Sequence, residues 1–233
     1  MFRRVYLDNS ATTAVDPQVV AEMLPFFSEN FGNASSIHFF GQEAKMAVDR
    51  ARHQAAQLIN CRANEIVFTS GGTESNNLAV RGILEANEDH GRHFITSTIE
   101  HSSIRALADD LEQRGWEVTR LSVGENGVVD AADVEAAIRP DTVLVSIMTA
   151  NNEIGTLQPV AEVGRMVKRL RGTGRKIWFH TDAVQAAGKA AVDVEESGCD
   201  LLSISGHKFH APKGVGLLYV RRGVRLHAQN IGG

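Results

Sequence analysis

Residues 201–219 read LLSISGHKFHAPKGVGLLY, in which two apolar runs flank a polar turn. The pattern predicts a strand, a turn and a second strand. Because the link between the runs is too short for a parallel crossover, the two strands are expected to be antiparallel. Lys208 stands in the turn. A lysine at such a buried edge has its pKa lowered, and its neutral amine can attack a carbonyl to form a Schiff base; the alternative is an ordinary surface lysine in a hairpin turn.

Upstream of this stretch, strand-like and helix-like segments alternate. Strands are predicted over residues 65–70, 93–98, 116–123, 142–148 and 176–182, and helices over 72–87, 101–115, 131–139 and 160–170, after two helical segments at 17–28 and 36–60. Strands alternating with such helices imply right-handed crossovers. The expected fold class is therefore α/β, with a mainly parallel seven-stranded sheet that helices cover on both faces.

Composition excludes several classes of protein. The chain has 233 residues, of which 43% are hydrophobic and 22% charged, as in an ordinary soluble globular protein. The 24 basic and 28 acidic residues include no basic block, which argues against nucleic acid. No apolar run approaches membrane-spanning length, and the first residues lack the apolar core of a signal peptide. Two cysteines fit a reducing compartment, so a cytoplasmic protein without membrane contact is expected.

Ligands of an open parallel sheet bind at the carboxyl ends of its strands, so the residues after each strand carry the functional prediction. After the first strand, SGGTESN (70–76) opens a helix. Backbone amides there, at Gly72 and Thr73, predict an anion site suited to a phosphate. The alternative is a plain helix cap with Glu74 in the first turn. The stretch lacks a dinucleotide fingerprint and the Gly-Lys pair of a nucleoside-triphosphate loop.

Three later strand ends carry further polar side chains. His101 either stacks on an aromatic cofactor and acts as an acid or base, or faces water. Asn152 and Glu153 either hold a substrate head group or belong to an Asn-rich turn. Asp182 follows the apolar run IWF, where a carboxylate needs a partner such as a protonated pyridine nitrogen. Gln185 lies where it could reach a ring hydroxyl. The alternative for Asp182 is a helix cap.

Taken together, these strand ends present a phosphate cradle, a stacking histidine, a polar anchor, a buried carboxylate and an amine. The set matches the needs of pyridoxal 5'-phosphate, whose electron-sink chemistry requires a lysine on the aldehyde and an acid on the ring nitrogen. The sequence therefore predicts a pyridoxal-phosphate site.

The same blocks resemble a known family. YLDNSATT, FGNASSIHFFGQEA, EIVFTSGGTESNN, EHSSI, NNEIGTLQP, HTDAVQAAGK and SGHKFHAPKGVGLLYVRR are similar, in order from residue 6 to about 233, to the blocks of the cysteine desulfurases. These are fold type I pyridoxal-phosphate enzymes of the aminotransferase class V family that take sulfur from L-cysteine and leave L-alanine. The His101 and Lys208 blocks resemble the branch that serves iron–sulfur and nitrogenase cluster assembly.

The resemblance implies a role for each matching residue. Lys208 would hold the cofactor as an internal aldimine, Asp182 would pair the pyridinium nitrogen, and Gln185 would bond the ring oxygen. His101 would stack on the ring and take part in proton transfer. Asn152 would lie near the substrate carboxylate. The phosphate would be bound by Gly72, Thr73, Ser205 and His207. Two departures from the family pattern, Ala34 for Pro and Ala211 for Gly, remove no chemical group.

Members of the family run well past this length, so residues 16–233 would form the cofactor-binding large domain. Residues 1–15 would be an arm that associates with a C-terminal small domain, absent here, which carries the sulfur-accepting cysteine. Neither Cys61 nor Cys199 matches the position of that nucleophile. The family also implies a homodimer and an iron–sulfur scaffold protein as sulfur acceptor. Two alternatives stay open: a non-catalytic cofactor-binding or dimerisation module, and another pyridoxal-phosphate lyase or aminotransferase.

Overall fold

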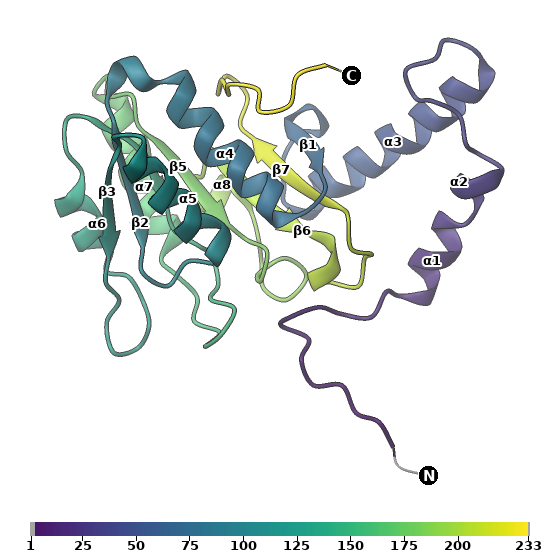
Figure 1. The fold of residues 1–233 in the computed structure, drawn as a ribbon, viewed down its shortest axis with the longest axis horizontal. Helices are drawn as coiled ribbons and strands as arrows, with labels where there is room; N and C mark the ends of the chain where they lie inside the picture. The colour runs from purple at the N-terminus through teal and green to yellow at the C-terminus, as the bar shows by residue number, and fades with distance from the viewer. Residues whose placement is uncertain (1–2, 233) are drawn as a thin grey trace.

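A computed structural model describes residues 3–232 of the chain and centres on one mixed sheet (Figure 1). The strand order is β1-β7-β6-β5-β4-β2-β3. The strands are β1 (Ile66–Thr69), β2 (His93–Ser97), β3 (Glu117–Leu121), β4 (Thr142–Ser146), β5 (Trp178–Asp182), β6 (Leu201–Ser205) and β7 (Gly216–Val220). The seven-stranded α/β sheet expected from the sequence is thus confirmed.

Strand direction also follows the sequence pattern. The pairs β2–β3, β2–β4, β4–β5 and β5–β6 are parallel. The strand β7 runs antiparallel to both of its neighbours, β6 and β1. A short link that contains Lys208 joins β6 to β7, and such a link permits only the antiparallel arrangement. The hairpin predicted at residues 201–219 is therefore present.

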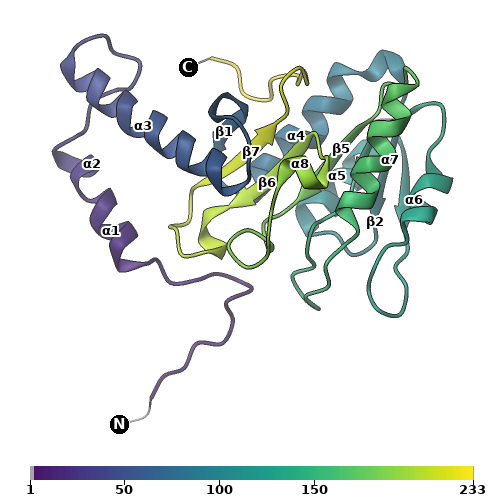
Figure 2. The same cartoon turned by 180° about the vertical axis from the view of Figure 1, so that it is seen from behind.

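Helices cover both faces of the sheet. The helices α4 (Gly72–Ala86) and α5 (Ser102–Gln113) lie on one face, and α6 (Ala131–Ala137), α7 (Val160–Gly172) and α8 (Val194–Ser197) lie on the other (Figures 1 and 2). The side chains of consecutive strand residues point to opposite faces of the sheet. On β2, Phe94 packs in the core under α4 and α5, whereas Ile95 packs in the core under α7. This period of two is what a strand buried on both sides requires.

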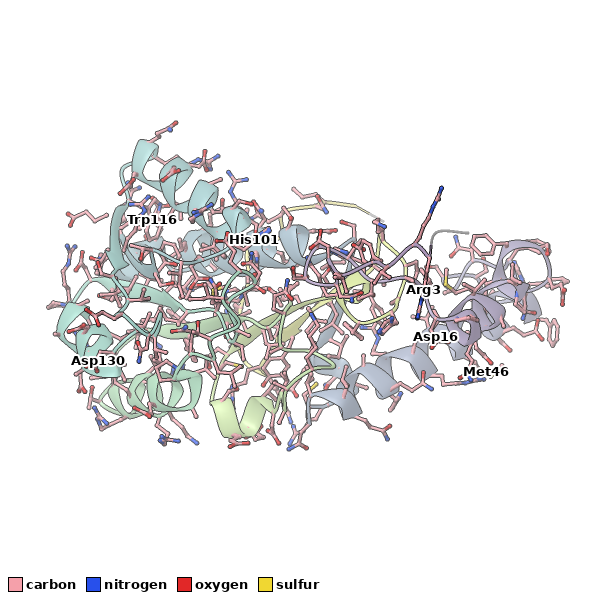
Figure 3. The ribbon with its side chains drawn as sticks, turned by 90° about the horizontal axis from the view of Figure 1, so that it is seen from below. Arg3, Asp16, Met46, His101, Trp116 and Asp130 are labelled. Carbon is pink, nitrogen blue, oxygen red and sulfur yellow. The ribbon has the colours of Figure 1, made fainter. Side chains whose placement is uncertain are left out.

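Before the sheet, the chain forms an arm and three helices that extend sideways. The helices are α1 (Pro17–Met23), α2 (Pro25–Ser28) and α3 (Phe39–Leu58). The predicted helix at 17–28 is split because Pro25 has no backbone N–H to continue α1. The helix α3 projects from the sheet, so that Met46 and Asp130 lie at opposite ends of the molecule with His101 between them (Figure 3).

The predicted helices and strands all occur, with ends shifted by a few residues. The sequence did not reveal α8, because four residues are too few to display a helical period. The C-terminal tail has neither helix nor strand over residues 223–232, the part of it that the structure describes. Within residues 3–232, no helix combines the length and apolar character needed to cross a membrane.

Candidate active site

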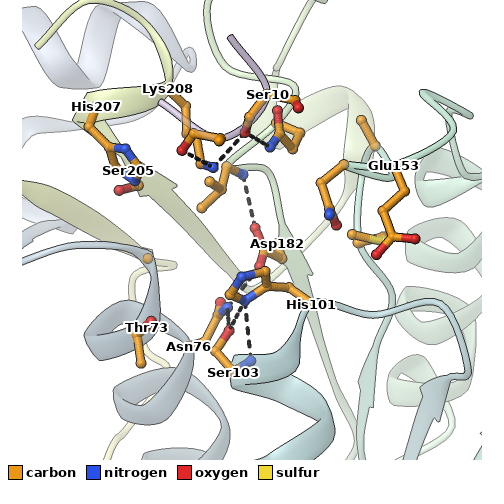
Figure 4. Close-up of a pocket in the computed structure, with 17 residues that line it drawn as sticks. Ser10, Thr73, Asn76, His101, Ser103, Glu153, Asp182, Ser205, His207 and Lys208 are labelled. Carbon is orange, nitrogen blue, oxygen red and sulfur yellow. Dashed lines mark hydrogen bonds between the residues drawn. The ribbon is translucent and has the colours of Figure 1, made fainter. Parts of the chain in front are cut away.

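A cavity of about 540 Å³ opens at the carboxyl ends of the parallel strands. It brings together every site residue that the sequence predicted, from five separate strand ends: Gly72, Thr73, His101, Asn152, Asp182, Gln185, Ser205, His207 and Lys208. Glu153, weighed beside Asn152 as an anchor, also lines it. The site expected from the pattern of strand ends is therefore one continuous space, as Figure 4 shows.

Lys208 is half-buried at the end of a short 3-10 turn that follows β6. Its Nζ atom donates hydrogen bonds to the carbonyl oxygens of Ser10, at 2.6 Å, and Ala11, at 2.8 Å. Burial, followed by the positive charge of Lys189, lowers the pKa of the Lys208 ammonium, while Asp182 opposes the shift. Desolvation thus enlarges the fraction of neutral amine, the form that attacks a carbonyl.

Asp182 ends β5 and is buried at the floor of the cavity. Its Oδ2 atom accepts a hydrogen bond from Asn76 Nδ2 at 2.7 Å, and its Oδ1 atom accepts one from the Val184 amide at 2.9 Å. Burial raises the pKa of this carboxyl, and these two bonds, with the charges of His101 and Lys208, oppose the rise. A cationic ring nitrogen in the cavity would add the charge partner that a buried carboxylate needs.

His101 is the N-cap residue of α5 and lines the cavity. Its Nδ1 atom lies 2.8 Å from Ser103 Oγ and accepts from the Ser103 amide at 3.2 Å. Capping thus fixes the ring at the place where β2 passes into α5.

The N-terminus of α4 forms the opposite end of the cavity. Its N-cap, Gly71, makes no side-chain capping bond, so an anion has access to the amides of the first turn. A Cβ atom at Gly72 would lie 2.8 Å from a methyl of Val184, which explains a glycine at this position. The hydroxyls of Thr73 and Ser205 line the same cavity.

Two of the predicted site residues, Gln185 and His207, already have hydrogen-bond partners at the rim of the cavity. Gln185 donates to the Ser10 carbonyl at 2.8 Å and accepts from Lys189 at 2.9 Å. His207 Nδ1 lies 3.1 Å from Thr12 Oγ1. Burial, followed by the charges of nearby lysines, lowers the pKa of His207. Both side chains therefore connect the cavity to the N-terminal arm.

Asn152 and Glu153 belong to a turn that Asn151 shapes. Asn151 Oδ1 accepts from the amides of Glu153, at 2.8 Å, and Ile154, at 3.0 Å. Its Nδ2 atom donates to the carbonyl of Ile99, at 2.9 Å, which ties the turn to the segment before His101. The Asn-rich sequence therefore forms a turn and also places Asn152 at the cavity, so the two readings of this stretch are compatible.

Sequence reasoning missed several residues of the cavity wall. Asn76 lies one helical turn after Thr73, and Ser103 lies two residues after His101, so helix periodicity could have indicated both. Ser10 and Ala11 reach the cavity from the far end of the chain. No local pattern marks such a contact.

Two further titratable groups are buried near the site. Burial raises the pKa of Glu100 to about 8, although its Oε1 atom accepts from Ser97 at 2.7 Å and from the Met148 amide at 2.9 Å. His180 lies between the hydroxyls of Ser146 and Ser203, at 2.8 and 3.0 Å, and burial lowers its pKa to about 3. Both groups are therefore held in their neutral forms at neutral pH.

The cysteines do not line the cavity. Cys199 is fully buried in the core and Cys61 is partly buried. Burial raises the pKa of each thiol to about 12, which suppresses the thiolate that a nucleophile requires. Across residues 3–232 there is also no group of three or more side chains suited to hold a metal ion.

The sequence and the fold are similar to those of known proteins. The family described as Aminotransferase class-V matches residues 5–233. The cysteine desulfurase IscS of Dictyoglomus turgidum is 49% identical over 233 residues, which cover all of this chain and 58% of that protein. The cysteine desulfurase IscS of Methanosarcina thermophila is 51% identical over 224 residues, or 96% of this chain and 54% of the relative.

Solved structures agree with these matches. A structure described as a NifS-like protein superposes with a TM-score of 0.95 at 42% identity, covering 99% of this chain and 62% of that one. A structure described as SspA in complex with cysteine has a TM-score of 0.93 at 40% identity, covering 98% of this chain and 65% of that one. The chain thus spans a little over half the length of the curated relatives it matches.

Proposed function

The chain belongs to the aminotransferase class-V family, and we propose that it forms the cofactor-binding part of a cysteine desulfurase, which takes sulfur from L-cysteine and leaves L-alanine. The main support for this proposal is that Lys208, Asp182 and His101 line one cavity with the N-terminus of α4. Residues 16–233 would be the large domain and residues 1–15 its arm.

The residues present fit pyridoxal phosphate as a cofactor. The uncapped N-terminus of α4, with Thr73, suits its phosphate, and the buried Asp182 carboxylate suits its ring nitrogen. A buried acceptor, Asn76 Oδ1, has no partner among the described side chains of this wall, as expected where a ligand completes the site. When bound, pyridoxal phosphate supplies the electron sink that allows an amino acid to lose its α-proton.

Each residue of the chain has a distinct part in this proposal. Lys208 offers a neutral amine for covalent attachment. Asp182 would hold the ring nitrogen protonated, and His101 would stack on the ring. Gln185 would bond the ring oxygen, and Asn152 would orient the substrate carboxylate. Gly72, Thr73, Ser205 and His207, which line the cavity, would hold the phosphate.

The sulfur-accepting thiol is proposed to come from outside these 233 residues. Cys61 and Cys199 lie away from the cavity, and burial suppresses their thiolates. In the full enzyme, sulfur would pass as a persulfide to a scaffold protein for iron–sulfur clusters in the cytoplasm. This part of the proposal rests on the similarity to proteins named cysteine desulfurase IscS.

We also propose that the chain pairs with a second copy. Residues 24–40 carry exposed apolar side chains, among them Phe27, 74% exposed, and Ile37, 92% exposed. Phe31 and Phe40 stack with ring centroids 6.0 Å apart, close to this surface. An apolar patch of this kind usually marks a protein interface. A homodimer would bury it.

The test compares two lysines of the same turn. Lys208→Ala and Lys213→Ala variants are mixed with pyridoxal phosphate, reduced with borohydride and analysed by absorbance and peptide mass spectrometry. We expect covalent cofactor on Lys208 in the wild type and in Lys213→Ala, which alters an exposed lysine, and none in Lys208→Ala. Visible absorbance that survives loss of Lys208 would contradict the assignment.

A second measurement separates cofactor binding from sulfur transfer. The 233-residue chain, loaded with pyridoxal phosphate, is expected to release no sulfide from L-cysteine at enzymatic rates. Rapid sulfide release that Cys61→Ser or Cys199→Ser abolishes would show that one of these thiols is the acceptor after all. Cofactor binding without activity, even when the rest of a relative's chain is added, would favour the alternative of a non-catalytic module.

A further inference from the structure

A run of hydrogen bonds links His101 to Asp182 across the floor of the cavity (Figure 4). His101 Nδ1 lies 2.8 Å from Ser103 Oγ, Ser103 Oγ lies 2.9 Å from Asn76 Nδ2, and Asn76 Nδ2 lies 2.7 Å from Asp182 Oδ2. Asn76 and Ser103 thus connect His101 and Asp182, whose roles were predicted separately. Both connecting side chains are buried.

The direction of the bonds at His101 is set by a backbone amide. The Ser103 N–H group points at Nδ1 over 3.2 Å, and a backbone N–H can only donate. Nδ1 therefore carries no proton in this arrangement, and the Ser103 hydroxyl must also donate to it. The proton of the neutral imidazole is then on Nε2.

The remaining bonds follow from the same count of protons. Since the Ser103 hydroxyl gives its hydrogen to His101, its oxygen is free to accept one hydrogen of the Asn76 amide. The other amide hydrogen goes to the Asp182 carboxylate. Turning the amide over would place Asn76 Oδ1 against that carboxylate, where two acceptors repel. Asn76, 1% exposed, is therefore held by its two donated bonds.

We propose that Asn76 and Ser103 are positioning residues that hold His101 as its Nε2–H tautomer and anchor the Asp182 carboxylate with the same amide. Neutral His101 then presents a hydrogen-bond donor, rather than an acceptor, to the cavity. A proton on Nδ1 would have to displace two donors at once. The role for the cofactor site rests on the proposed function, whereas the tautomer itself does not.

Nuclear magnetic resonance reports the tautomer directly, without cofactor. The chain is labelled with ¹⁵N in its histidines, long-range ¹H–¹⁵N spectra are recorded above the pH range in which histidine is charged, and the His101 signals are identified by their loss in His101→Gln. We expect the pattern of a ring protonated at Nε2. A wild-type His101 protonated at Nδ1 would overturn the proposal, and this result needs no variant that might fold poorly.

Variants then test the two connecting residues. Ser103→Ala leaves Nδ1 with the longer backbone bond alone. Asn76→Leu removes the amide whose donated bond polarises the Ser103 hydroxyl as a donor to Nδ1. Each change removes one interaction that favours an unprotonated Nδ1. We therefore expect the fraction of His101 protonated at Nδ1 to rise roughly fivefold in both variants. Ser103→Thr keeps the hydroxyl and should keep the wild-type pattern.

Ser102→Ala is the matched control, because Ser102 is the exposed neighbour of Ser103 on α5. The proposal is wrong if Asn76→Leu and Ser103→Ala give the same spectra as Ser102→Ala. If Asn76 and Ser103 had a purely structural role, their variants would lose thermal stability but keep the wild-type His101 spectra.

Cofactor titration tests the second half of the proposal. Asn76→Leu removes a bond to the charged Asp182, so pyridoxal phosphate should bind about tenfold more weakly than to the wild type or Ser102→Ala. Unchanged binding would overturn the anchoring of Asp182. Should the wild type bind no pyridoxal phosphate while His101 keeps its Nε2–H pattern, the proposed function fails and the tautomer assignment stands.

Discussion

Lys208 Nζ lies 2.6 Å from the carbonyl oxygen of Ser10, although 198 residues separate them in the chain. The N-terminal arm therefore crosses the mouth of the cavity and holds the lysine proposed to bind the cofactor. The arm is fixed in turn by Thr13, whose amide and hydroxyl both donate to the His207 carbonyl, at 2.9 and 3.0 Å. The hydroxyl of Thr13 also accepts from the His210 amide, at 2.7 Å.

The first prediction concerns this arm. Thr13→Val keeps the shape of the side chain but removes the hydroxyl that two backbone groups of the Lys208 turn contact. We expect local opening of residues 8–14 to become easier by about 1 kcal/mol, which is roughly fivefold faster amide hydrogen exchange there. Ser10→Ala serves as the control, because Lys208 contacts the carbonyl of Ser10 and not its side chain. Equal exchange in the two variants would show that Thr13 does not anchor the arm.

The second prediction concerns the buried carboxyl of Glu100. Its pKa is raised from 4.5 to about 8, so its contribution to stability is fully present below about pH 4.5 and is lost as the pH rises to about 8. Glu100→Gln mimics the protonated form. In the wild type, the free energy of unfolding should fall by up to about 1.4 kcal/mol per pH unit as Glu100 becomes harder to keep protonated. We expect the variant to lack this fall.

Urea unfolding between pH 5 and 9 measures this difference. The free energy of unfolding of Glu100→Gln should rise relative to that of the wild type up to about pH 8 and then level off, whereas that of Glu125→Gln, on an exposed turn, should not. A constant difference across this range would mean that Glu100 does not titrate as described.

The third prediction uses two glycines of α7. A Cβ atom at Gly164 would lie 1.9 Å from the Ser197 carbonyl oxygen of α8, whereas one at Gly172 would meet nothing within 4 Å. Gly164→Ala should force the two helices apart and destabilise the protein by about 2 kcal/mol or more. Gly172→Ala should be neutral or stabilise by up to about 1 kcal/mol. Thermal melting of both variants checks this, and equal melting temperatures would contradict the close packing.

The fourth prediction contrasts a buried ion pair with an exposed one. Asp200 is 0% exposed and accepts from Arg171 Nη1 at 2.7 Å and from the Phe179 amide at 2.9 Å. Asp200→Ala should cost about 2–3 kcal/mol, because it leaves the buried Phe179 amide and the partly exposed Arg171 guanidinium without their shared acceptor. Glu135→Ala breaks an exposed pair with Arg169 and should cost less than about 1 kcal/mol. Chemical unfolding measures the free energy of unfolding of both variants. Similar losses relative to the wild type would contradict the prediction.

Sequence periodicity alone determined the class of fold. The alternation of strands and helices from residue 65 onward predicted the parallel sheet, and the short link around Lys208 predicted the antiparallel β7. These signals are readable because side-chain burial repeats every two residues in a strand and every three to four in a helix. The rule that ligands meet strand ends then brought His101, Asp182 and Lys208 to one site.

Tertiary structure decided how those residues are held. The bonds that join Asn76 to Ser103 and to Asp182 span 27 and 106 residues, and the bond from Lys208 to Ser10 spans 198. Contacts over such distances depend on how crossovers and loops pack in three dimensions, which no local pattern records. The sequence by itself therefore determined the sheet and the chemical groups at its edge. Only the folded chain determined the orientation of His101 and the closing of the arm over Lys208.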